Sequence, residues 1–264
     1  MINAIKDGLI ITKRQLLQLS RVPEVLIFST IQPVMFVLLF RYVFGGAINT
    51  PGSDYVQFLM PGIFVQTVAF TLATTSVGLA MDMTKGLIDR FRSLPIARSA
   101  VVLGRTLGDA TLNIVVLLVM ALTGFIVGWR PSGGVVSITA GFMLLMLFGY
   151  AMSWIGVLIG ISVRDARTAN NLVFLIVFPM TFLSNAFAPT TAMPRVLQYF
   201  AEWNPVSTMV AACRELFGLE NQFGVTAGSF PSENPILMSI IYIFALMVVL
   251  IPVSTAKYKR TSSR

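Results

Sequence analysis

Residues 135–159 read VVSITAGFMLLMLFGYAMSWIGVLI, an uncharged run long enough to cross the hydrocarbon core of a bilayer as one α-helix. Five further long apolar runs begin near Val25, Val56, Ala100, Leu172 and Ile236. Because lipid offers the backbone no hydrogen-bond partner, apolar runs of this length form spanning helices. The sequence therefore predicts an all-α membrane protein with six transmembrane helices.

The composition supports the same class. The chain has 264 residues, of which 56% are hydrophobic and 11% are charged, which is too apolar for an ordinary soluble domain. This length leaves room for one helical bundle, so we expect a single transmembrane domain over residues 1–264.

The basic residues predict the orientation. If both termini are cytoplasmic, fifteen of the 19 basic residues fall on the inner side, and four fall outside: Arg41, Arg130, Arg195 and Arg214. The inner residues are Lys6, Lys13, Arg14, Arg21, Lys85, Arg90, Arg92, Arg98, Arg105, Arg164, Arg167, Lys257, Lys259, Arg260 and Arg264. Lys and Arg accumulate in cytoplasmic loops. The net charge of +8 therefore indicates a multi-pass protein of the plasma (cell inner) membrane, and no nucleic-acid partner.

The sequence lacks the usual residues of several enzyme classes. It has no histidine and a single cysteine, Cys213, so zinc, haem, an intrachain disulfide and a Ser-His-Asp set are not expected. It has no G-x-x-x-x-G-K-[ST] loop for nucleotide phosphates. We therefore expect a non-enzymatic subunit that binds no cofactor, and any ATP and Mg²⁺ must be bound by another subunit.

Three polar segments break the apolar pattern. Residues 1–22 predict a basic amphipathic helix lying on the membrane lipids. Residues 84–94 carry Leu87, Phe91 and Leu94 at helical spacing, which fits either a solvated cytoplasmic loop or a short helix that docks a partner. Residues 189–220 predict two short helices separated by Asn204-Pro205, which form a re-entrant hairpin or an external cap before the last span.

Asp109 is the one carboxylate clearly inside a predicted span. An acid within the membrane is a functional candidate, but Arg105 stands four residues earlier on the same helix face. An intramembrane ion pair is thus the favoured interpretation over a proton relay. An ion-coupled carrier usually needs more such acids, so the sequence disfavours this function.

Two predicted spans carry distinctive faces. In the second, small and hydroxylated residues recur beside Gln66 at Thr67, Thr71, Thr74, Thr75 and Gly78. In the fifth, Phe174, Phe178 and Phe182 form an i, i+4, i+8 stripe. Either face is typical of helix packing. Together, they could also line a path for an amphiphile, because ligand pockets combine apolar walls with a few polar groups.

Two segments resemble a known family. Residues 86–109, GLIDRFRSLPIARSAVVLGRTLGD, and residues 178–216, FPMTFLSNAFAPTTAMPRVLQYFAEWNPVSTMVAACREL, resemble the permease subunits of ABC-2 type ABC transporters, especially daunorubicin-resistance-like drug exporters. The resemblance implies a coupling helix at residues 84–94, with Leu87, Arg90, Phe91 and Arg92 on a separate ATPase. It also implies a unit of two ATPases and two permeases, a homodimer or a heterodimer, with Gln66, Thr71, Phe174, Phe178 and Phe182 along the substrate path.

The expected function is export of an amphiphilic drug-like or lipid-like compound. The main alternative is export of a lipid-linked glycan by the same architecture. An ion-coupled carrier or channel and a non-transporting membrane scaffold are further alternatives.

Overall fold

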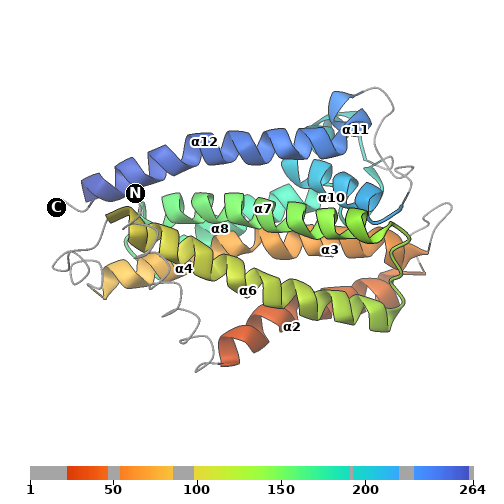
Figure 1. Cartoon of the computed structure of the whole chain (residues 1–264), viewed down its shortest axis with the longest axis horizontal. Coiled ribbons are helices and arrows are strands. Elements are labelled where there is room, and N and C mark those ends of the chain that lie inside the picture. The colour runs from red at the N-terminus through yellow and green to blue at the C-terminus, as the bar shows by residue number, and fades with distance from the viewer. Residues whose placement is uncertain (1–22, 47–53, 86–97, 191–192, 220–228, 262–264) are drawn as a thin grey trace.

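The computed structural model describes residues 23–46, 54–85, 98–190, 193–219 and 229–261. Within these ranges the chain is helical and contains no strand. The predicted interfacial helix, residues 1–22, and nearly all of the predicted coupling helix, residues 84–94, lie outside the described residues. The helices run roughly along one long axis (Figure 1) and are α2 (Pro23–Leu39), the π-helical turn η1 (Phe40–Phe44), α3 (Tyr55–Ala69), α4 (Thr71–Thr84), α6 (Arg98–Val127), α7 (Val135–Gly160), α8 (Ala166–Phe182), α9 (Arg195–Glu202), α10 (Pro205–Leu216), α11 (Phe230–Glu233) and α12 (Pro235–Thr261).

Four helical stretches in the described part of the chain are long and apolar enough to cross a membrane. They are Tyr55–Thr84, Val102–Val127, Val135–Gly160 and Pro235–Tyr258. This result confirms an all-helical, multi-pass membrane protein. The first predicted span corresponds to a shorter apolar stretch, Ser29–Phe44, and the fifth to α8, so the count of six spans stays a prediction.

Helix α8 differs from the other predicted spans because its first half is polar. It begins at Ala166, where the Asp165 side chain caps it by accepting a 2.7 Å hydrogen bond from the Thr168 backbone N–H. That bond and a second from the Thr168 hydroxyl hold the pKa of the Asp165 carboxyl below its usual value. Only the part near Leu172–Phe182 is apolar, and this is the part that the sequence pattern detects.

The centre of the bundle is the column formed by α3 and α4. Nearly every side chain of α3 is buried, and α4 packs closely on α7. A Cβ atom on Gly156 would lie 2.6 Å from the Leu72 carbonyl oxygen, and one on Gly160 would lie 2.8 Å from that of Ser76. Glycine lets the two backbones approach this closely, as small residues do between membrane helices.

The column is interrupted at Phe70, between α3 and α4. Phe70 keeps a 3.1 Å hydrogen bond from its N–H to the Gln66 carbonyl, and its own carbonyl accepts a short-range bond of 2.8 Å from the Ala73 N–H. The interruption therefore leaves the two helices nearly continuous. It lies midway along the predicted second span, between the polar residues Gln66 and Thr71.

Helices α9 and α10 occupy the segment between α8 and the last long helix. Their connecting turn is fixed from two sides, since the Asn204 amide donates to the Met180 and Leu183 carbonyls and the Tyr242 hydroxyl donates to the Trp203 carbonyl. Tyr242 is seven residues after Pro235, or about 10 Å along α12. The turn thus lies about two helical turns along α12 rather than at its start.

From that turn, α10 runs toward the connection between α6 and α7. There the Phe217 carbonyl accepts hydrogen bonds from the backbone N–H groups of Ser132 and Gly133, at 3.0 and 3.1 Å. Residues Val206–Arg214 are all buried, packed against α3, α7 and α12.

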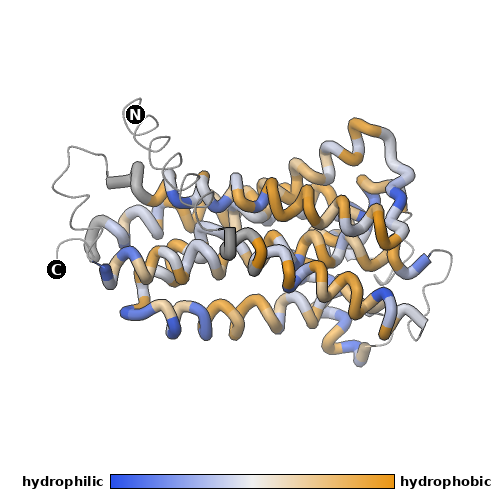
Figure 2. Tube along the Cα trace, turned by 90° about the horizontal axis from the view of Figure 1, so that it is seen from below, coloured by the Kyte–Doolittle hydropathy of each residue, from blue (hydrophilic) through white to orange (hydrophobic). Residues whose placement is uncertain are grey.

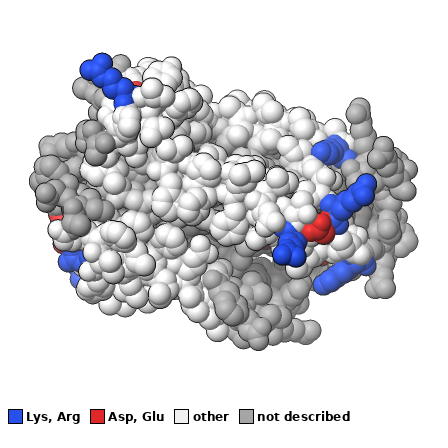
Figure 3. All heavy atoms as spheres, turned by 180° about the vertical axis from the view of Figure 1, so that it is seen from behind, with Lys and Arg blue, Asp and Glu red and all other residues white. Residues whose placement is uncertain are grey.

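Polar residues gather largely toward the two ends of the bundle, and hydrophobic residues dominate between them (Figure 2). On the face seen in Figure 3 the middle of the bundle is free of charged side chains. At one end, Lys257 donates to the Ser162 hydroxyl and Arg105 pairs with Asp82. At the other, Arg41 pairs with Asp54.

Candidate functional site

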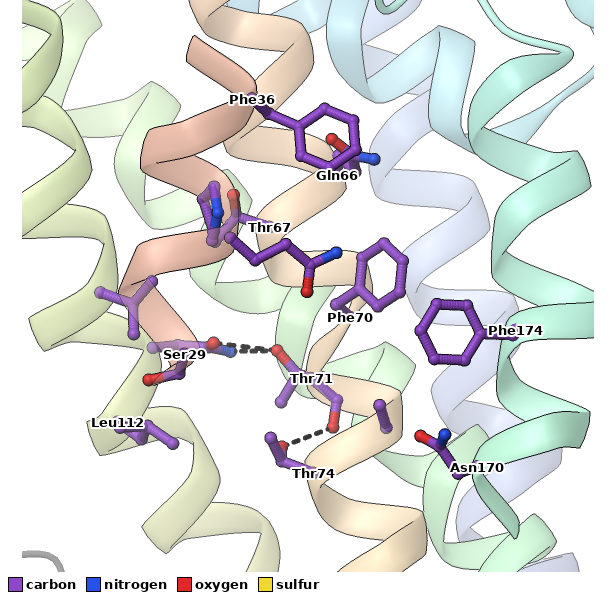
Figure 4. Close-up of a pocket in the computed structure, with 15 residues that line it drawn as sticks. Ser29, Phe36, Gln66, Thr67, Phe70, Thr71, Thr74, Leu112, Asn170 and Phe174 are labelled. Carbon is purple, nitrogen blue, oxygen red and sulfur yellow. Dashed lines mark hydrogen bonds between the residues drawn. The ribbon is translucent and has the colours of Figure 1, made fainter. Parts of the chain in front are cut away.

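A cavity with a volume of about 200 Å³ lies between α2, the α3–α4 column, α6 and α8. Exposed Gln32 and Phe174 stand on its wall, so it opens to the surface of the chain. Figure 4 shows side chains from all four sides pointing into it. The lining residues are Ser29, Gln32, Pro33, Phe36, Gln66, Thr67, Phe70, Thr71, Ala73, Thr74, Leu112, Asn113, Val116, Asn170 and Phe174.

One part of the cavity wall is aromatic. The rings of Phe70 and Phe174 meet edge to face, with centroids 5.7 Å apart and planes inclined by 61° (Figure 4). Phe36 of α2 adds a third ring. Such a wall offers dispersion contacts and stacking to an apolar ligand.

The other part of the wall is polar but uncharged. The Asn113 amide of α6 donates a 2.6 Å hydrogen bond to the Thr71 hydroxyl of α4, and Thr74 donates to the Thr71 carbonyl at 2.8 Å. Gln66 and Asn170 bring further amide groups. An amphiphile placed here could therefore bond to one wall and stack on the other.

The cavity includes three of the five residues that the sequence assigned to a substrate path, namely Gln66, Thr71 and Phe174. Phe178 and Phe182 do not line it. They lie on the exposed face of α8, where their rings stack with centroids 4.3 Å apart.

A row of rings connects these two phenylalanines to the cavity. The ring centroids of Phe182 and Phe187 lie 5.3 Å apart, and Phe187 stacks on Phe40 with centroids 4.8 Å apart. Phe36, which lines the cavity, contacts Phe187 at 6.3 Å. The aromatic stripe of α8 thus continues across to α2.

Several lining residues were not found by the sequence analysis, among them Gln32, Phe36, Phe70 and Asn113. Asn113 stands four residues after Asp109, so both occupy one face of α6, a spacing that could have pointed to it. The other three reach the cavity through the placement of α2 beside the α3–α4 column, which no pattern within one helix contains.

A cluster of charged and polar groups lies beside the cavity and extends toward the C-terminal end of α4. The Arg105 Nε atom is 3.5 Å from Asp109 Oδ2, and its Nη1 atom is 3.4 Å from Asp82 Oδ2. Thr75 donates to Asp109 at 2.6 Å, and Arg105 Nη2 donates to the carbonyl of the cavity residue Thr74 at 3.1 Å. Arg105 therefore contacts two residues of α4, Thr74 and Asp82, and also Asp109 on its own helix.

Arg214, which the sequence analysis counted among the basic residues on the outer side of the membrane, is a buried arginine. Its Nε and Nη2 atoms donate to the Phe58 carbonyl at 3.2 and 3.1 Å, and Nη2 also donates to the Asn185 carbonyl at 2.8 Å. Its side chain is fully buried. Nothing in its local sequence distinguishes it from an exposed basic residue.

In the described part of the chain, no group of three or more acidic, Cys or His side chains is arranged to bind a metal ion. The cavity walls offer a ligand stacking, hydrogen bonding and apolar contact.

A bundle of membrane-crossing helices around an open cavity with aromatic and polar walls defines a polytopic membrane protein with a candidate binding site. Residues 8–217 match the model of the ABC-2 type transporter family, and the chain belongs to this family as a permease subunit. The resemblance seen in residues 86–109 and 178–216 is thereby confirmed.

Similar proteins include transport permeases of bacteria and algae. The daunorubicin resistance ABC transporter permease protein DrrB1 of Streptomyces coeruleorubidus is 32% identical over 203 residues, covering 77% of this chain and 72% of that protein. The probable doxorubicin resistance ABC transporter permease protein DrrC of Mycobacterium tuberculosis is 23% identical over 260 residues, covering 98% and 90%. The putative transport permease ycf38 of Cyanophora paradoxa is 25% identical over 218 residues, covering 81% and 74%.

Proposed function

We propose that this permease exports an amphiphilic drug-like or lipid-like compound from the cell, driven by ATP that a separate ATPase subunit hydrolyses. Membership of the ABC-2 family supports an ATP-driven mechanism over an ion-coupled carrier. The names of its DrrB1 and DrrC relatives, which refer to resistance to daunorubicin and doxorubicin, support a drug-like substrate.

The observation that carries the proposal is the cavity. Phe70 and Phe174 form its aromatic wall, and Thr71 with Asn113 forms its polar wall. An amphiphile has one apolar and one polar part, and a pocket with these two walls contacts both. The exposed row of Phe178 and Phe182 extends the apolar wall along α8.

The working unit in this proposal has two permeases and two ATPase subunits, in the plasma (cell inner) membrane. The cavity opens toward the exposed faces of α2 and α8, and a second permease beside these helices would close it. The ATPase subunit binds ATP and Mg²⁺. That subunit docks through Leu87, Arg90, Phe91 and Arg92, which lie outside the described residues.

The test is ATP-dependent accumulation of daunorubicin in inside-out vesicles that contain the permease and its ATPase. We expect accumulation with ATP, and loss of most of it in Thr71→Val and Phe174→Ala. Ile126→Ala is the matched control, because Ile126 is 79% exposed and outside the cavity. Accumulation that follows a proton or sodium gradient without ATP would support the carrier alternative, and equal rates in all variants would contradict the role of the cavity.

A further inference from the structure

None of the described residues that line the cavity is ionisable. The polar members are the four amides Gln32, Gln66, Asn113 and Asn170 and the four hydroxyl residues Ser29, Thr67, Thr71 and Thr74. A charged group that leaves water for such a site loses much of its hydration and gains only neutral dipoles in return.

Among the described residues, Arg105 is a charged group in direct contact with this lining, but its side chain is occupied. Nη2 donates to the Thr74 carbonyl, Nη1 faces Asp82, and Nε faces Asp109. The guanidinium of Arg105 is therefore not available to an anionic ligand in the cavity.

Three other described arginines are engaged away from the cavity, whereas Arg167 is exposed on α8 about one turn before the lining residue Asn170. Arg41 pairs with Asp54, Arg130 donates to the carbonyls of Phe125 and Trp129, and Arg214 donates to those of Phe58 and Asn185. None of them is among the lining residues.

The aromatic wall also disfavours an anionic ligand. The face of a phenyl ring carries partial negative charge and its edge partial positive charge, so a ring face attracts cations and repels anions. Phe36, Phe70 and Phe174 bring three such rings to the cavity. The uncharged lining and these rings together favour an uncharged or cationic amphiphile over a sulfonate, carboxylate or phosphate.

We infer that the cavity selects by charge, accepting uncharged or cationic amphiphiles and rejecting anionic ones. This inference rests on the proposed function, because it takes the cavity as the substrate site. It also separates the two substrate classes that the sequence left open, since a lipid-linked glycan carries an anionic phosphate headgroup and a neutral or basic drug does not.

The experiment compares two probes with the same rings, N-phenyl-1-naphthylamine, which is uncharged, and 8-anilino-1-naphthalenesulfonate, its sulfonated counterpart. The full-length Gln32→Cys variant in lipid nanodiscs reports occupancy, because a ligand in the cavity slows alkylation of the new thiol by N-ethylmaleimide. The native Cys213 is buried and contributes little background. Probe concentrations are matched by partitioning into protein-free nanodiscs. We expect the sulfonate to require a concentration at least about tenfold higher for equal protection, a difference of about 1.4 kcal/mol.

The control for effects on the lipid is Ile126→Cys, exposed on α6 and outside the cavity. Equal protection of Gln32→Cys by both probes would overturn charge selection while leaving the cavity as an amphiphile site. Protection of neither thiol, or of both alike, would overturn the cavity as substrate site and the inference with it.

A gain-of-function variant tests the cause. Asn170→Lys, made in the Gln32→Cys background, places an ammonium group on the cavity wall at a half-buried position, where a long side chain can keep its charged end hydrated. We expect it to strengthen sulfonate protection at least about fivefold relative to the uncharged probe, because opposite charges attract strongly where water is scarce. Asn170→Gln should leave the ratio unchanged, and an unchanged ratio in Asn170→Lys would overturn the electrostatic explanation.

Discussion

The guanidinium of Arg214 lies 3.7 Å from the centre of the Phe58 ring and donates to the carbonyl of the same residue. Because Arg214 is on α10 and Phe58 on α3, this contact fastens α10 to the central column. The further bond to the Asn185 carbonyl adds the segment that follows α8. One buried side chain thus connects three parts of the bundle.

Arg214→Lys is expected to destabilise the permease by about 2–4 kcal/mol, because an ammonium group cannot reach both carbonyls and also stack on the ring. The measurement is the thermal unfolding midpoint in detergent. Arg130→Lys is the matched control, since Arg130 is exposed. A loss of the same size in both variants would contradict a special role for Arg214.

Gly78→Ala is expected to break the Arg105 cluster, because the guanidinium of Arg105 lies where the new Cβ atom would be. Displacing it leaves Asp109 without its cation inside the bundle, and we expect a loss of about 1–3 kcal/mol in unfolding free energy. Gly134→Ala serves as control, since its Cβ would meet no atom within 4 Å. A wild-type midpoint for Gly78→Ala would show that Arg105 has another equally good position.

Hydropathy predicted the long uncharged helix well, and residues 135–159 lie within α7. It did not predict the interruption at Phe70, where an apolar sequence simply continues from α3 into α4. It also placed the start of the fifth apolar run at Leu172, six residues after α8 begins, because the first turns of α8 carry Arg167, Asn170 and Asn171. Apolar runs report lipid contact and burial, whereas helix ends depend on caps such as Asp165.

The candidate site was predictable only where its residues share one helix face. Gln66 and Thr71 lie close together on the column, and Phe174 heads a regular stripe, so periodicity identified them. Asn113 and Gln32 join them from other helices, and their placement depends on how the helices pack. Periodicity also treated Phe174, Phe178 and Phe182 as equivalent, although only Phe174 reaches the cavity.

The predicted topology is open to a direct test with cysteines at two positions, Ser229→Cys and Ser262→Cys. Since the distribution of basic residues predicts cytoplasmic termini, an impermeant maleimide added to whole cells should label position 229 and not position 262. Cys213 is buried and should give little signal. The opposite labelling pattern would invert the topology, and with it the predicted cytoplasmic side of residues 84–94.

Phe178→Ala is expected to change daunorubicin transport or drug-stimulated ATPase activity without loss of assembly. Phe178 is 49% exposed and stacks on Phe182 outside the cavity, so its removal leaves little void within the chain. Transport assays in vesicles and co-purification of the ATPase are measured on the same preparations. If assembly falls in parallel with transport, the ring serves packing between subunits rather than the substrate.

Phe91→Ala is expected to uncouple the ATPase from transport. A permease without a phosphate-binding loop must obtain the energy of ATP hydrolysis through contact with its partner ATPase. Phe91 is the large aromatic residue of the predicted coupling helix, and truncating an aromatic anchor at an interface commonly costs about 2 kcal/mol or more, roughly 30-fold in affinity. We expect the variant to lose the ATPase on co-purification, or to retain it while ATP hydrolysis no longer drives transport. Lys85→Ala is the control and should change little, since rim charges contribute less. The permease itself should still insert and fold, as Phe91 lies outside the apolar runs, and a Phe91→Ala variant with normal binding and normal transport would refute the docking assignment.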